Sequence, residues 1–89
     1  QGKFEEAERM HRLVFVGLEM ALGSEHPYTF YAVNQIGLAL GKQGKYEKAS
    51  EMHRYAFNGL KRVLDPEHPE TIYSVNSMNL SHEITLNKE

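Results

Sequence analysis

The chain has 89 residues, a formal net charge of −2 and no cysteine; 40% of its residues are hydrophobic and 25% are charged. This length allows one small domain. The basic residues are scattered, so they give no electrostatic footprint for nucleic acid or an anionic membrane. The lack of cysteine excludes a disulfide framework and a thiolate metal site. The longest apolar run, residues 13–16, is too short to cross a bilayer. Because there is no secretion signal, we expect a cytoplasmic protein, and because residue 1 is Gln we expect a piece of a longer chain.

The sequence repeats with a period of 42 residues. When residues 1–42 are laid on residues 43–84, 20 of the 42 positions are identical. The shared segments include Gly-Lys-Phe-Glu-Glu-Ala and Gly-Lys-Tyr-Glu-Lys-Ala at 2–7 and 44–49, Met-His-Arg at 10–12 and 52–54, and Glu-His-Pro at 25–27 and 67–69. We therefore expect a single domain over residues 1–89, made of repeat units at about 1–42 and 43–84 and belonging to a longer array.

Hydrophobic spacing in the first unit predicts two helices. Apolar and small residues recur three and four positions apart from Phe4 onward, which predicts a helix over residues 3–22. Pro27 suits the first turn of the following helix, where a missing N–H costs nothing. The apolar spacing continues that second helix over residues 28–42.

The second unit predicts two helices at the equivalent places. Gly41 and Gly44 bracket a short turn, after which the spacing predicts a helix over residues 45–63. Pro69 then starts a helix over residues 70–84. Short loops make neighbouring helices antiparallel, and a constant period packs each pair on the next with the same rotation. The expected fold is therefore an all-α, right-handed α-solenoid of antiparallel helix pairs with four helices.

Small residues mark places where helix backbones approach each other. Gly37 and Ala49 are spaced to face each other across a helix hairpin. Gly17 and Gly59 recur in the middle of long helices, where glycine costs about 1 kcal/mol relative to alanine. Tight packing and simple copying within an array both explain that recurrence.

The repeated Gly-Lys-Tyr-Glu-Lys-Ala start, the Glu-His-Pro loop and the Val-Asn helix resemble tetratricopeptide repeats of the kinesin-light-chain type. The segments Glu-Met-His-Arg and Pro-Glu-His-Pro-Glu-Thr resemble most the arrays at the C-termini of fungal NOD-like receptor proteins, in which a NACHT or NB-ARC domain precedes the repeats. The resemblance covers residues 1 to about 80. It implies a scaffold for protein–protein interaction, in which the first helix of each pair lines a concave, partner-binding groove.

The resemblance also implies which residues line the groove. The positions of this sequence that match are Tyr31, Asn34, Tyr73 and Asn76, and one turn further along the same face lie Leu38 and Leu80. An asparagine side chain both donates and accepts, so a row of asparagines could hold the backbone of an extended peptide. Lys42 is the candidate on this face for contacting a carboxylate.

Catalytic and metal-binding sites are not expected. The five histidines include no pair on one helix with the spacing of a zinc site, so we interpret them as packing or capping residues. No nucleophile with a matching base can be assembled, so we expect neither an enzyme nor a cofactor. The remaining functions are capture of a protein or peptide in the groove, structural self-association, and an intramolecular regulatory surface.

The N-terminal helix favours self-association. Its apolar stripe of Phe4, Ala7, Met10, Val14 and Leu18 lacks the first helix of its own pair. Contiguous apolar patches of this kind seek partners. A two-fold homodimer through residues 3–22 is the simplest closed arrangement.

Overall fold

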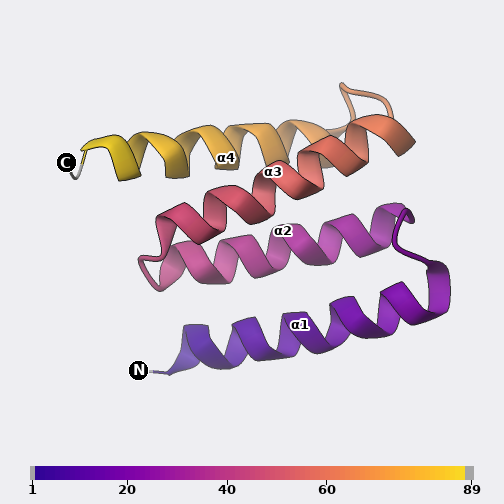
Figure 1. Cartoon of the computed structure of the whole chain (residues 1–89), viewed down its shortest axis with the longest axis horizontal. Helices are drawn as coiled ribbons and strands as arrows, with labels where there is room; N and C mark the ends of the chain where they lie inside the picture. The colour runs from indigo at the N-terminus through magenta and orange to yellow at the C-terminus, as the bar shows by residue number, and fades with distance from the viewer. Residues whose placement is uncertain (1, 88–89) are drawn as a thin grey trace.

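The computed structural model describes residues 2–87 of the chain as four α-helices in sequence order (Figure 1). They are α1 (Lys3–Leu22), α2 (Pro27–Lys42), α3 (Tyr46–Val63) and α4 (Pro69–Asn87). The expected all-α solenoid is confirmed, and the expected helix bounds differ from these by one residue at most, apart from the three further residues at the end of α4. In the part of the chain that the structure describes, no helix is long and apolar enough to span a bilayer.

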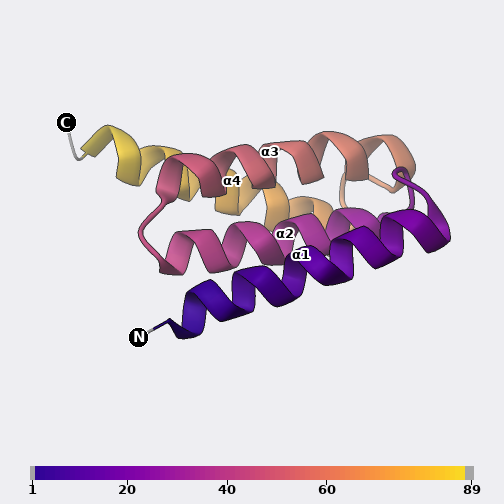
Figure 2. The same cartoon turned by 60° about the horizontal axis from the view of Figure 1, so that its bottom comes forward.

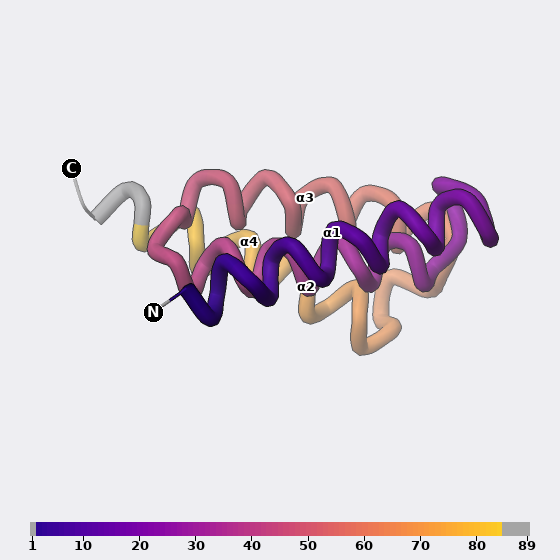
Figure 3. The backbone as a smooth tube through the Cα atoms, turned by 90° about the horizontal axis from the view of Figure 1, so that it is seen from below, coloured from indigo at the N-terminus to yellow at the C-terminus, as the bar shows by residue number. Residues whose placement is uncertain are grey.

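Each helix runs antiparallel to the one before it and packs mainly on its sequence neighbours (Figures 1 and 2). Seen from below, α4 starts at the edge opposite α3 and crosses behind α1 and α2 toward the side of α3 (Figure 3). This arrangement brings α2 and α4 into direct contact, although α3 separates them in the sequence. The stack measures 38 × 29 × 16 Å. Its outermost helices, α1 and α4, each have a side that no other helix covers.

The Glu-His-Pro loops start α2 and α4 in the same way. The Nδ1 atom of His26 accepts a hydrogen bond from the Tyr28 N–H at 3.0 Å, and that of His68 accepts one from the Glu70 N–H at 3.2 Å. The following proline occupies the first helical position, where its missing N–H leaves no unmet hydrogen bond. The interpretation of these two histidines as capping residues is therefore confirmed.

Two buried threonines hold the loops against the helices that follow. Thr29 donates to the carbonyl oxygen of Gly23 at 2.8 Å, and Thr71 donates to that of Asp65 at 3.3 Å. Both pairs occupy equivalent positions 42 residues apart. The loop geometry is therefore repeated along with the sequence.

The hydrophobic core lies between α2 and α3. One cluster consists of Phe30, Val33, Ala56 and Leu60, and the other of Ile36, Leu40 and Ala49. Phe15 from α1 and Met52 from α3 pack against both clusters and join them. The α2–α3 pair is thus the centre of the stack.

The predicted contact between Gly37 and Ala49 is wrong by one helical turn. A Cβ atom on Gly37 would lie 2.8 Å from Nε2 of His53, so Gly37 faces that imidazole. Ala49 instead lies opposite Gly41, where an added Cβ would be 3.9 Å away. The large His53 ring therefore lies next to Gly37, and the contact between two small residues is that of Gly41 with Ala49, at the end of the hairpin.

The two mid-helix glycines differ in their surroundings. A Cβ atom on Gly59 would overlap the Phe30 ring, which is fully buried, whereas one on Gly17 would meet nothing within 4 Å. Close helix packing therefore explains Gly59. Gly17 lies at the equivalent position on the uncovered side of α1, where no helix approaches.

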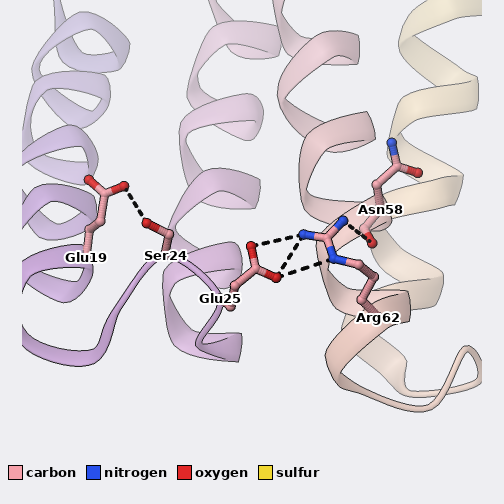
Figure 4. A network of polar contacts seen from close by, with 5 residues as sticks. All are labelled: Glu19, Ser24, Glu25, Asn58 and Arg62. Carbon is pink, nitrogen blue, oxygen red and sulfur yellow. Dashed lines mark hydrogen bonds and ion pairs between the residues drawn. The ribbon is translucent and has the colours of Figure 1, made fainter.

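An exposed ion pair connects α3 to the loop between α1 and α2 (Figure 4). The guanidinium of Arg62 donates to both carboxylate oxygens of Glu25, at 2.9 and 3.1 Å, and also to the carbonyl oxygen of Asn58. Both charged side chains are more than half exposed. Such a pair contributes about 1 kcal/mol or less, so it orients the loop more than it stabilises the fold.

The glycine pair gives a matched test of the packing. We expect Gly59→Ala to lower the free energy of unfolding by about 1–3 kcal/mol, because the buried Phe30 ring has to move. Gly17→Ala should leave stability unchanged or raise it by up to about 1 kcal/mol, through helix propensity alone. Urea denaturation followed by circular dichroism measures both. Equal effects of the two substitutions would contradict the close contact at Gly59.

Candidate functional site

A groove with a volume of about 210 Å³ lies between α2 and α4, with α3 as its floor. Each wall helix starts at the proline of a Glu-His-Pro segment, so α2 and α4 occupy the same place in consecutive repeats. The lining residues are Gly37, Leu38, Gly41 and Lys42 from α2, Tyr46 and His53 from α3, and Tyr73, Ser77, Leu80, Ser81 and Ile84 from α4. The packing of α2, α3 and α4 therefore leaves a hollow, and part of its lining comes from residues that the resemblance predicts for a binding site.

Four of the seven predicted site residues line this groove: Leu38, Lys42, Tyr73 and Leu80. The side chains of Leu38 and Leu80 are 40% and 59% exposed and lie on opposite walls. Lys42 is exposed at the end of α2, with its ammonium 5.8 Å from the centroid of the Phe4 ring. The groove thus offers two accessible apolar walls and a positive charge at one end.

Tyr31 lies outside the groove, near the start of α2. Its ring stacks on that of His68 with centroids 6.5 Å apart. Burial, with a smaller effect from the Glu70 carboxylate, raises the pKa of Tyr31. Tyr31 therefore packs against the loop that leads into α4, beyond the groove.

The predicted role of Asn34 on an open face needs correction. Asn34 is fully buried, and its amide joins three helices. Its Nδ2 atom donates to Ser74 Oγ at 2.6 Å, and its Oδ1 lies 3.0 Å from Nδ1 of His53. An asparagine bound in this way cannot hold a peptide in the groove, because the next helix already occupies the space in front of it.

The hydrogen bonds around Asn34 fix the state of the His53 ring. Ser74 donates its hydroxyl hydrogen to the Glu70 carbonyl at 2.9 Å, so its oxygen accepts from Asn34. Asn34 therefore turns its carbonyl oxygen toward His53, and the ring donates from Nδ1. Nε2 is left as the unprotonated nitrogen, on the side of Gly37 and the groove.

His53 forms part of the groove floor as a neutral imidazole. The ring is 3% exposed, and burial lowers its pKa from 6.5 to about 4. Tyr73 meets it edge-on with centroids 5.7 Å apart, which closes the floor from the side of α4. His53 is the one histidine at the centre of the site, and its repeat position alone did not distinguish it from His11.

Asn76 differs from its repeat equivalent Asn34. It is exposed on α4 and is not among the residues that line the groove. The difference arises because Asn34 has α3 and α4 against it, whereas α4 is the last described helix. One signal in the sequence pointed to the buried network: Ser74 stands where the first unit has Ala32, which adds a hydroxyl within hydrogen-bonding distance of Asn34.

The described residues offer no group of three or more histidine or acidic side chains placed to hold a metal ion. The lining of the groove combines apolar side chains with a few polar groups.

Comparison with known proteins agrees with the geometry. A family model described as "Tetratricopeptide repeat" matches residues 1–28 and 29–70. The second match has the length of the repeat period (70 − 29 + 1 = 42 residues) and covers the α2–α3 pair almost entirely. No curated protein matches the chain.

The buried imidazole predicts that stability decreases in acid. The pKa of His53 is lower in the folded state, about 4, than the 6.5 of an unfolded chain. The contribution is complete above pH 6.5 and is lost as pH falls towards 4, by about 3 kcal/mol in total. Urea denaturation at a series of pH values should show this slope, and His53→Gln should remove it.

His11→Gln is the control for that experiment, because it removes the histidine at the equivalent position of α1 and leaves His53 in place. The part of the slope that His53 contributes should remain in this variant. An unchanged slope in His53→Gln would contradict the assignment.

The two asparagines form a second matched pair. Asn34→Ala should lower the free energy of unfolding by about 2–4 kcal/mol, because it leaves buried groups of His53 and Ser74 without a partner. Asn76→Ala, at an exposed position, should change stability by about 0.5 kcal/mol or less. Denaturation curves of dilute protein compare them, and equal effects would place Asn34 on an open surface after all.

Proposed function

Because the chain belongs to the tetratricopeptide repeat family, we propose that it is a non-catalytic module that binds an extended segment of a partner protein in the groove between α2 and α4. Repeats of this family generally mediate protein–protein interaction and are generally non-catalytic. The groove, with Leu38 and Leu80 on its walls, is the observation that carries the proposal.

The size and shape of the groove support a protein ligand. Its volume of about 210 Å³ is below the roughly 300–1,000 Å³ of pockets that enclose small molecules. It fits one or two side chains of a segment whose backbone stays outside. The exposed leucines offer apolar area to such side chains, and Lys42 offers a charge to a nearby carboxylate.

The proposed setting is a larger, receptor-like protein in the cytoplasm, in which the repeats sense a ligand or act as a scaffold. The resemblance of the Pro-Glu-His-Pro-Glu-Thr loop to arrays of fungal NOD-like receptor proteins supports this setting. The balanced surface charge supports a protein partner over nucleic acid or a membrane. A coding sequence upstream of residue 1 that specifies a nucleotide-binding domain would agree with the proposal, and one that specifies a coiled coil would contradict it.

Self-association is a second candidate function. It is favoured by apolar side chains on the uncovered side of α1, where Met10, Leu13 and Met20 are 62%, 70% and 83% exposed. An intramolecular regulatory surface is a further candidate, in which the convex face of the array would hold another domain.

A peptide-display library tests the groove directly. We expect selected peptides to shift the amide resonances of α2 and α4 around Leu38 and Leu80, and the double substitution Leu38→Glu/Leu80→Glu to weaken their binding about tenfold or more, because it places two charges in an apolar contact. Met20→Glu, on α1 and away from the groove, is the matched control. Peptides that bind the double variant as well as the wild type would move the binding site elsewhere.

A further inference from the structure

The imidazole of His53 lies at the boundary between the buried hydrogen-bond network and the groove. Its Nδ1 atom lies 3.0 Å from the side-chain oxygen of Asn34, which does not line the groove. Its Nε2 atom is the ring atom nearest to the Cβ position of Gly37, which lies about one turn further along α2 and does line the groove. The two nitrogens of the ring point in different directions, so one belongs to the network and the other faces the hollow.

The nitrogen that faces the hollow is a hydrogen-bond acceptor. A neutral imidazole carries one N–H, and His53 uses it at Nδ1 toward Asn34, so Nε2 keeps its lone pair. Within the part of the chain that the structure describes, Nε2 has no hydrogen-bond partner. A partner side chain that enters the hollow excludes water from this nitrogen. It therefore binds well only if it brings a donor of its own.

The lining of the groove favours a donor without a charge. Lys42 places a positive charge at one end, and none of the described residues that line the groove is acidic. A lysine or arginine of the partner would lose its hydration in the groove and find no carboxylate to replace it. A hydroxyl or a carboxamide donates a hydrogen bond and avoids this cost.

Ser77 adds a second polar group on the wall that α4 forms. Tyr73 meets the His53 ring edge-on, with centroids 5.7 Å apart, and Ser77 lies one turn further along α4, where it lines the groove. Hydroxyl and carboxamide groups both donate and accept. A side chain that donates to Nε2 of His53 can thus also accept a hydrogen bond from Ser77.

We propose that the groove selects a partner segment by one uncharged donor side chain, a serine, threonine, asparagine or glutamine, which donates a hydrogen bond to Nε2 of His53. Apolar neighbours of that side chain contact Leu38 and Leu80, whose exposed side chains form the walls. This inference rests on the proposed function, because it names the residue type that the groove receives. His53 then determines specificity in addition to holding α3 against α2.

Peptides selected from the display library for binding in the groove test the proposal from the side of the ligand. We expect each of them to carry such a donor residue at one position. Its replacement by an apolar residue of the same shape, threonine by valine or asparagine by leucine, should weaken binding about two- to tenfold, the effect of one hydrogen bond. Isothermal titration calorimetry measures the difference.

Two substitutions of His53 separate its role in the fold from its role in the groove. His53→Asn places an amide N–H where the ring has Nδ1, so it can still donate to Asn34, but it has no acceptor at the position of Nε2. His53→Gln reaches the position of Nε2 with a carbonyl oxygen but has no donor at that of Nδ1.

The two variants should therefore rank in opposite orders. We expect His53→Gln to be the less stable in urea and to keep the preference for a threonine peptide over its valine counterpart. His53→Asn should be the more stable and should bind the two peptides equally. A role of His53 in the fold alone predicts the same order in both measurements. Circular dichroism confirms that each variant is folded under the conditions of binding.

The other outcomes overturn the inference in distinguishable ways. Peptides that depend on Leu38 and Leu80 but bind equally well with valine in place of threonine would contradict this inference and leave the proposed function intact. A library that yields no peptide at the groove would contradict both. A preference for the donor that survives His53→Asn would place the acceptor on another residue. In support, the Nε2 nitrogen resonance of His53 should move upfield when the threonine peptide binds and stay in place with the valine peptide.

Discussion

The side-chain amide of Asn34 holds three helices in one arrangement, and the geometry of the groove follows from it. The amide donates to Ser74 of α4 and accepts from His53 of α3, while Asn34 itself belongs to α2. Buried polar groups of this kind stabilise only when each has its partner, so the network admits one spacing of the helices. The first helices of two consecutive repeats are thereby kept at a fixed separation, with an imidazole between them.

Glycine makes this spacing possible. The His53 ring can lie against α2 only because residue 37 has no side chain, and α3 can approach the Phe30 ring only because residue 59 has none. Both contacts bring α3 close to α2 and leave the groove open on the side of α4. The cost of glycine within a helix, about 1 kcal/mol relative to alanine, is offset at these two positions by the burial of a large ring.

The sequence predicted the features that depend on near neighbours. Helix bounds follow from apolar spacing, and the start of each pair follows from the proline and from the histidine before it. The sequence did not separate Asn34 from Asn76, because the repeat gives the two residues the same local surroundings. What distinguishes them is the next helix, which covers Asn34 and leaves Asn76 exposed. The contact of Gly37 was misplaced for a similar reason, since a periodic pattern gives the face of a helix but not the partner at each turn.

The same spacing determines what a partner segment would meet in the groove. The groove has α2 and α4 as walls and α3 as floor, and the Asn34 amide bonds to both α3 and α4. Because these bonds lie within the protein, the separation of the walls is set before a segment binds. A site formed in advance loses less conformational entropy on binding, so a substitution that breaks the network should weaken binding in the groove even though Asn34 does not line it.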